Sequence, residues 1–114
     1  MNVKILFIAI YRALECLEEE TKCEAISAFL DKANPYIFKD RKSADPIIFN
    51  EFVKWIEDNN LEVRLETSYA LVQRYITENT PFAAFFEDID EEEWTSLIDI
   101  IKNEEPQLVE KDYE

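Results

Sequence analysis

The amino-acid sequence predicts an all-α protein, a compact bundle of five to six helices with an irregular loop near residues 34–45. The 114 residues include no glycine, the residue that supplies positive φ angles in hairpin turns and bulges at no steric cost. Apolar residues recur every three to four positions in long segments, as on one face of an α-helix. Asp45-Pro46 and Thr80-Pro81 each combine a favourable helix N-cap with proline at the first helical position. Together these features favour helices over sheets.

The segment Val3–Leu17 predicts a helix that is apolar on more than one side. Its main apolar face, at helical spacing, consists of Val3, Leu6, Phe7, Ile10, Leu14 and Leu17. Ile5, Ile8 and Ala9 add a second apolar flank, so we expect a central core helix or one that also contacts a second subunit. The alternative is the first strand of an α/β fold, but such a strand usually leads into a turn that contains glycine. The run is too short to span a bilayer, and no small-residue cleavage site follows it, so we expect mature protein without a membrane segment.

The second helix is predicted from a capping pattern. Thr21 and Glu24 have the T-x-x-E spacing of a capping box, which predicts a helix from about residue 22 to residue 33. Asn34-Pro35 should end this helix, because the residue before proline disfavours the helical conformation.

Residues 36–44 predict an irregular connection that holds most of the only basic cluster. The cluster consists of Lys39, Arg41 and Lys42, with Lys32 nearby. We interpret it as a solvated loop that offsets the acidic surroundings. Contact with a phosphate or an acidic partner is the alternative interpretation.

The second half of the chain predicts four more helices. Asp45 caps a helix that runs through about Asp58, and a helix over about residues 61–77 follows, although residues 61, 63 and 65 also alternate as in a short strand. A short helix is expected at 81–87, and a last helix at about 91–103, where Asp90 and Glu93 have the spacing of a capping box. We expect a single helical domain over 1–106 and a frayed acidic C-terminal tail over 107–114.

The composition argues against most catalytic and metal-binding chemistry. The chain has no histidine, and its two cysteines, Cys16 and Cys23, match neither a C-x-x-C redox motif nor a zinc site. Without glycine it has no phosphate-binding loop, nucleophile elbow or dinucleotide fingerprint. We therefore expect no enzymatic activity, no cofactor and no metal ion. We interpret the cysteines as core residues in a reducing, cytoplasmic compartment.

The negative charge is unevenly distributed along the chain. The net charge is −14, and residues 61–114 carry 15 acidic and 4 basic side chains, a net of −11. Residues 1–60 carry 11 acidic and 8 basic side chains, a net of −3. Because such a chain repels nucleic-acid phosphates and anionic lipids, we expect no nucleic-acid partner and no membrane partner. A charged partner is expected to be basic.

The acidic stretch near residue 90 is the best candidate for a partner-binding surface. It lacks the ordered ligands and central glycine of an EF-hand loop, and adjacent surface carboxylates have no reason to hold different pKa values for acid–base catalysis. The alternative is an N-cap followed by a solvated helix start, where the helix dipole favours negative charge. The predicted partner-binding residues are Glu87, Asp88, Asp90, Glu91, Glu92, Glu93 and Asp99.

These patterns support two main hypotheses for function. The first is a small acidic helical interaction module that binds a basic protein partner, in the manner of an immunity protein, antitoxin or inhibitor. The second is a homodimeric structural or regulatory protein without catalytic activity, joined through Val3–Leu17. An enzyme that uses carboxylates with a divalent metal ion is the third and least supported hypothesis.

Overall fold

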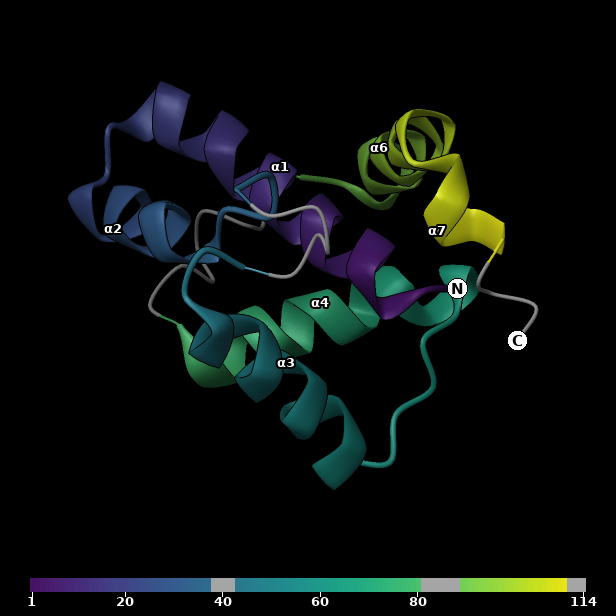
Figure 1. Ribbon diagram of the computed structural model, residues 1–114. Helices are drawn as coiled ribbons and strands as arrows, with labels where there is room; N and C mark the ends of the chain where they lie inside the picture. The colour runs from purple at the N-terminus through teal and green to yellow at the C-terminus, as the bar shows by residue number, and fades with distance from the viewer. Residues whose placement is uncertain (38–42, 81–88, 111–114) are drawn as a thin grey trace.

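Helix α1 (Val3–Thr21) crosses the middle of the molecule, and the other helices pack around it (Figure 1). The computed structural model describes residues 1–37, 43–80 and 89–110, and within these ranges it contains six helices and no strand. The other five are α2 (Glu24–Ala33), α3 (Pro46–Asp58), α4 (Leu65–Asn79), α6 (Glu91–Glu104) and α7 (Pro106–Glu110). The predicted all-α bundle is confirmed.

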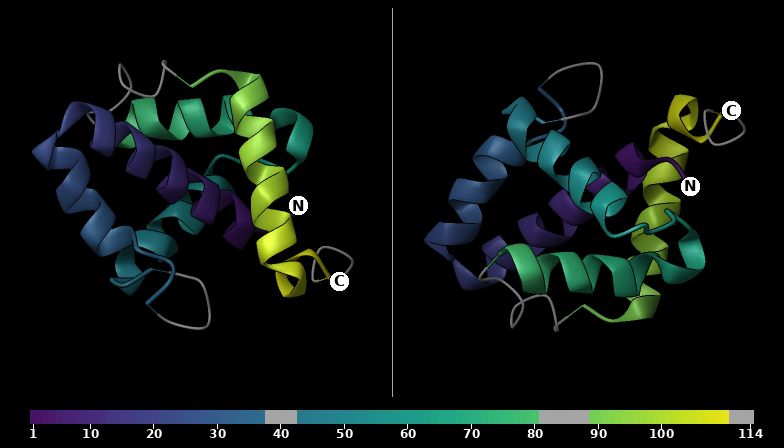
Figure 2. Two further views of the ribbon diagram at one scale, coloured as in Figure 1. Left: turned by 90° about the horizontal axis from the view of Figure 1, so that it is seen from above. Right: turned by 90° about the horizontal axis from the view of Figure 1, so that it is seen from below.

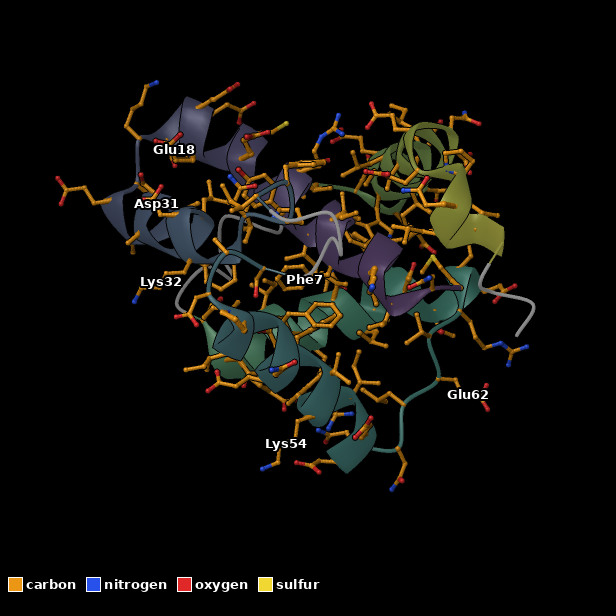
Figure 3. All side chains as sticks on the ribbon, viewed as in Figure 1. Phe7, Glu18, Asp31, Lys32, Lys54 and Glu62 are labelled. Atoms are coloured by element: carbon orange, nitrogen blue, oxygen red, sulfur yellow. The ribbon has the colours of Figure 1, made fainter. Side chains whose placement is uncertain are left out.

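The apolar residues of α1 explain its central position. The seven consecutive residues from Ile5 to Tyr11 are all buried, so this part of the helix is covered on every side. Helices α2, α6 and α7 pack along it, and Figure 2 shows α4 beside it as well. The ring of Phe7 points toward α3 and lies 5.3 Å from the ring centroid of Phe49 and 5.7 Å from that of Phe52 (Figure 3). The prediction of a central core helix is confirmed.

Aromatic rings join α3 to α4 below α1. Tyr75 of α4 lies between two aromatic residues of α3, with ring centroids 4.7 Å from Phe52 and 5.3 Å from Trp55. Both pairs have the edge-to-face geometry that the quadrupoles of aromatic rings favour. The guanidinium of Arg74 lies 5.6 Å from the Trp55 ring centroid, where a cation–π contact extends the aromatic cluster to the surface.

Two side-chain contacts orient α6 against its neighbours. Trp94 of α6 donates its indole N–H to Ser68 Oγ of α4 at 2.9 Å, and both residues are buried. On the other side, Arg12 of α1 donates to Glu104 Oε1 at 2.8 Å. With Trp94, Ile98 and Ile101 turned into the core, these contacts set which face of α6 remains on the surface.

Two predicted helix starts are confirmed. The Asp45 carboxylate accepts a hydrogen bond from the backbone N–H of Ile47 at 3.1 Å, and Pro46 occupies the first turn of α3. The Asp90 carboxylate accepts from the backbone N–H of Glu93 at 2.8 Å. In both helices the side chain satisfies a backbone donor that has no partner inside the helix.

The predicted capping box at Thr21 and Glu24 is wrong. Thr21 is the last residue of α1, and its hydroxyl donates to the carbonyl of Leu17. The chain turns at Lys22, which adopts a left-handed conformation with φ of 56°, and α2 begins after Cys23 without a side-chain cap. The last buried residue of α1 is Leu17, and its final turn is held by hydrogen bonds that the Thr21 hydroxyl and the Lys22 N–H donate to backbone carbonyls.

Residues 61–64 do not form the first turn of α4, in contrast to the predicted helix over 61–77. Asn60 has a φ of 54°, and the chain is extended at Arg64 before α4 begins at Leu65. Leu61 and Val63 are partly buried against the core, and no strand is formed in this stretch. The short apolar alternation therefore reflects an extended connection that packs on the core.

Residues 107–110, which are predicted to belong to a frayed tail over 107–114, are part of a short helix. Pro106–Glu110 forms α7, Leu108 is buried, and the side-chain amide of Asn2 donates to the carbonyl of Leu108 at 3.0 Å. The contact with α1 supplies the stabilisation that a five-residue helix lacks by itself. Residues 111–114, the predicted helix at 81–87 and the basic residues of the 38–42 segment lie outside the described residues.

Candidate acidic interaction surface

The first turn of α6 places most of the predicted partner-binding residues on the surface. Asp90, Glu91, Glu92, Glu93 and Asp99 are all exposed. The first four occupy the N-cap and first turn, so their carboxylates project from one end of the helix. Glu87 and Asp88 lie outside the described residues.

The local helix chemistry accounts for acidic residues at this position. Asp90 is used as the N-cap, and the next three glutamates lie at the positive end of the helix dipole, where a negative charge contributes about 0.3–1 kcal/mol at low ionic strength. Within the described parts of the chain, Glu91, Glu92, Glu93 and Asp99 form no ion pair with lysine or arginine. Their charge is therefore not neutralised by those parts of the molecule.

The negative potential acts on a neighbouring tyrosine. Tyr69 of α4 donates its hydroxyl to the carbonyl of Ile89, immediately before the acidic turn. Burial, followed by the negative charges of Asp90, Glu91 and Glu93, raises the pKa of Tyr69. The tyrosine also ties the chain that enters α6 to α4.

An apolar surface lies beside the acidic turn. Asp90, Glu92 and Glu93 border a shallow depression of about 470 Å³, which among the described residues is also lined by Ser96, Leu97 and Ile100. Ile100 keeps 48% of its surface exposed, although Ile98 and Ile101 on either side are buried. We call the six lining residues the α6 depression; it has an acidic rim and an apolar floor.

The predicted partner-binding residues are all acidic and do not include Leu97 and Ile100, which form the apolar floor of the α6 depression. The apolar repeat Trp94, Leu97, Ile98 and Ile101 predicts that Leu97 is buried, but in the structure it is only partly buried. Ile100 lies out of phase with the buried residues Trp94, Ile98 and Ile101, and this mismatch is the feature from which its exposure follows. Asp99 is exposed on α6 but does not line the depression.

A second depression, of about 350 Å³, lies between the extended connection and α4. It is lined by Asn60, Leu61, Glu62, Arg64, Thr67, Ala70, Leu71 and Arg74. Its two arginines are already paired with acidic residues: Arg64 with Glu62 at 3.3 Å, and Arg74 with Glu78 at 2.6 Å. The arginines therefore offer little net positive charge to an anionic ligand.

Cys16 and Cys23 are both free thiols. Cys16 is exposed, so its interpretation as a core residue is wrong, and Cys23 is partly buried. Partial desolvation of the thiol, followed by the negative charges of Glu19 and Glu15, raises the pKa of Cys16. The higher pKa disfavours the reactive thiolate.

The described residues form no metal site and no membrane-spanning helix. In residues 1–37, 43–80 and 89–110, no group of three or more His, Cys, Asp or Glu side chains is arranged to hold a metal ion. Among the helices given above, none combines the length and apolar character needed to span a bilayer.

Comparisons with protein-family models, curated proteins and solved structures find no match to this chain.

Proposed function

We propose that this protein is a small acidic interaction module that binds a basic protein partner through the exposed side of α6, as an immunity protein, an antitoxin or another protein inhibitor does. The observation that carries the proposal is the acidic turn of α6, whose carboxylates are exposed beside the apolar residues Leu97 and Ile100. The net charge of −11 in residues 61–114 gives the same preference for a cationic partner.

The acidic turn is suited to attract such a partner from a distance. The electrostatic screening length at physiological ionic strength is about 8 Å, so carboxylates clustered within one helical turn act on an approaching cation together. Complementary charge mainly raises the association rate and excludes partners of the wrong sign. The function therefore requires no catalytic residue and no cofactor.

The homodimer alternative has less support. Its basis was the two-sided apolar character of Val3–Leu17, and the central part of that segment is covered by helices of the same chain. A dimer through this segment would require the bundle to open. Two copies would also bring together surfaces of the same negative sign.

The proposal is tested by capturing partners from an extract of the native host and then measuring association with the purified partner. We expect a basic partner whose association rate falls steeply between about 20 and 500 mM NaCl, because salt screens the attraction. The triple variant Glu91→Gln/Glu92→Gln/Glu93→Gln should slow association by about tenfold.

A matched variant controls for total charge. Glu51→Gln/Glu57→Gln/Asp58→Asn removes three exposed carboxylates from α3, which lies away from α6 in Figure 1. This variant should retain most of the association rate. Salt-independent binding, or an equal loss in the two triple variants, would contradict the proposed surface. Melting curves for both variants verify that the fold is intact.

A further inference from the structure

We infer that the α6 depression receives a cationic amphipathic segment of the partner, with one apolar side chain on Leu97 and Ile100 and lysine or arginine side chains at the acidic rim. This inference rests on the proposed function and adds the chemistry of the docked segment. It depends on the acidic and apolar residues occurring together in one depression.

The floor of the depression offers a fixed apolar contact. Leu97 and Ile100 are three residues apart on α6 and therefore lie on the same side of the helix. Leu97 packs against the core, which holds it in place, whereas Ile100 is 48% exposed and does not belong to the core cluster. Covering them with an apolar side chain would tighten binding by at least about tenfold.

The charges give the docked segment a direction. Asp90, Glu92 and Glu93 lie at the N-terminal end of α6, and Ile100 lies about two turns further along. Beyond it, the carboxylate of Glu104 is already engaged by Arg12 at 2.8 Å. The cationic part of the segment therefore lies toward the start of α6 and its apolar side chain toward Ile100.

The same charges exclude other occupants. A second copy of this chain, with its net charge of −14, would bring carboxylates toward the rim and be repelled. Nucleic-acid phosphates and anionic lipid headgroups would be repelled for the same reason. A positively charged protein segment is the occupant that satisfies both the rim and the floor.

The test uses two synthetic helical peptides of equal length and equal positive charge, one with leucines along one side and one with serines in the same positions. Binding to the full-length protein is measured by isothermal titration calorimetry at low ionic strength. The leucine peptide should bind at least about tenfold more tightly, because burying one apolar side chain is worth a factor of this size. Ile100→Ser should remove most of this difference.

Ile47→Ser is the matched control for the apolar substitution. Ile47 is 60% exposed at the start of α3, so the substitution removes an exposed isoleucine elsewhere on the molecule. This variant should keep the tenfold preference for the leucine peptide. A preference that persists in Ile100→Ser, or that both serine variants lose equally, would place the apolar contact elsewhere and overturn the inference.

The peptides also separate this inference from the proposed function. Equal binding of the two peptides, with a loss in Glu92→Gln/Glu93→Gln, would overturn the apolar contact and leave the acidic interaction surface intact. Failure of both peptides to bind would likewise overturn the inference. The proposed function would still be judged by the captured partner and its salt dependence.

Discussion

Ser68 and Trp94 show how a single hydroxyl group satisfies a buried polar atom. Trp94 is fully covered in the core, and its indole N–H donates to Ser68 Oγ, 2.9 Å away. The Ser68 hydroxyl donates in turn to the carbonyl of Leu65 at 2.9 Å. The pair links α4 to α6 close to the acidic turn, so the position of the proposed surface depends on it.

We predict that Ser68→Ala destabilises the protein by about 1–3 kcal/mol, because it removes the hydroxyl that accepts a hydrogen bond from the buried indole N–H of Trp94. Urea denaturation followed by tryptophan fluorescence measures the change. Ser96→Ala, at an exposed position of α6, should change stability by less than about 0.5 kcal/mol. An equally small effect of Ser68→Ala would show that the buried hydrogen bond is not needed.

Tyr75 links the aromatic cluster of α3 and α4 to the pH dependence of stability. Burial, followed by the negative charge of Glu51, raises the pKa of Tyr75 to about 12. In the unfolded chain its pKa is about 10, so the unfolded state loses the proton first as pH rises. The contribution of the protonated Tyr75 hydroxyl to folding stability is fully present below about pH 10 and is lost progressively as pH rises toward 12.

We therefore predict that the free energy of unfolding falls more for the wild type than for Tyr75→Phe between about pH 9 and pH 11.5, by about 2 kcal/mol. The phenylalanine variant keeps the ring contacts with Phe52 and Trp55 and removes the titrating group. Urea denaturation at the two pH values measures the difference. Parallel losses in the two proteins would show that Tyr75 does not titrate with the expected shift.

At the scale of the helices, two turns in the described part of the chain have a positive φ angle at a residue other than glycine. Lys22 ends α1 with a φ of 56°, and Asn60 follows α3 with a φ of 54°. Asparagine tolerates this left-handed conformation better than lysine does. The backbone N–H of Lys22 still donates to the carbonyl of Glu18 at 2.7 Å, so α1 ends in a hydrogen-bonded turn at some conformational cost.

We predict that Lys22→Gly stabilises the protein by about 1 kcal/mol, since glycine adopts the left-handed conformation without a clash of Cβ. Lys22→Ala is the matched control, because it removes the same charge but keeps Cβ, and it should bring no such gain. Thermal melts monitored by circular dichroism compare the two. Equal melting temperatures for the two variants would contradict a cost at this turn.

At the scale of the whole molecule, a helical core carries a strongly negative surface. Helix α1 is enclosed by its neighbours, while the exposed faces carry most of a net charge of −14. Such an excess of like charge opposes the compact state by mutual repulsion. The same excess of negative charge is the basis of the proposed preference for a basic partner.

We predict that the free energy of unfolding rises between about 20 and 300 mM KCl at neutral pH, because salt screens the repulsion among exposed carboxylates. The urea midpoint at each salt concentration measures this change. The triple variant Glu91→Gln/Glu92→Gln/Glu93→Gln should show a weaker salt dependence. A midpoint that falls with added salt would show that exposed ion pairs, such as Arg74 with Glu78, outweigh the repulsion.

Part of the proposed surface follows from local sequence and part does not. The acidic turn could be predicted because Asp90, the glutamates after it and the apolar spacing of the last helix are neighbours in the sequence. The exposure of Ile100 also follows from local sequence, because Ile100 lies out of phase with the buried apolar repeat of this helix. The partial exposure of Leu97 could not be predicted, because it depends on how Trp94–Ser68 and Arg12–Glu104 set the rotation of α6. The accessibility of Leu97 is thus a consequence of contacts between distant residues.

The amino-acid sequence by itself determined the all-α class, the helix starts at Asp45 and Asp90, and the excess of negative charge, because periodicity, capping and composition are local properties. Only the tertiary structure decided that α1 is enclosed by its own chain, that residues 61–64 stay extended, and that α7 docks through Asn2 and Leu108. These outcomes depend on contacts between residues far apart in sequence, and the free energy of such contacts overrides the weak local preferences of short segments.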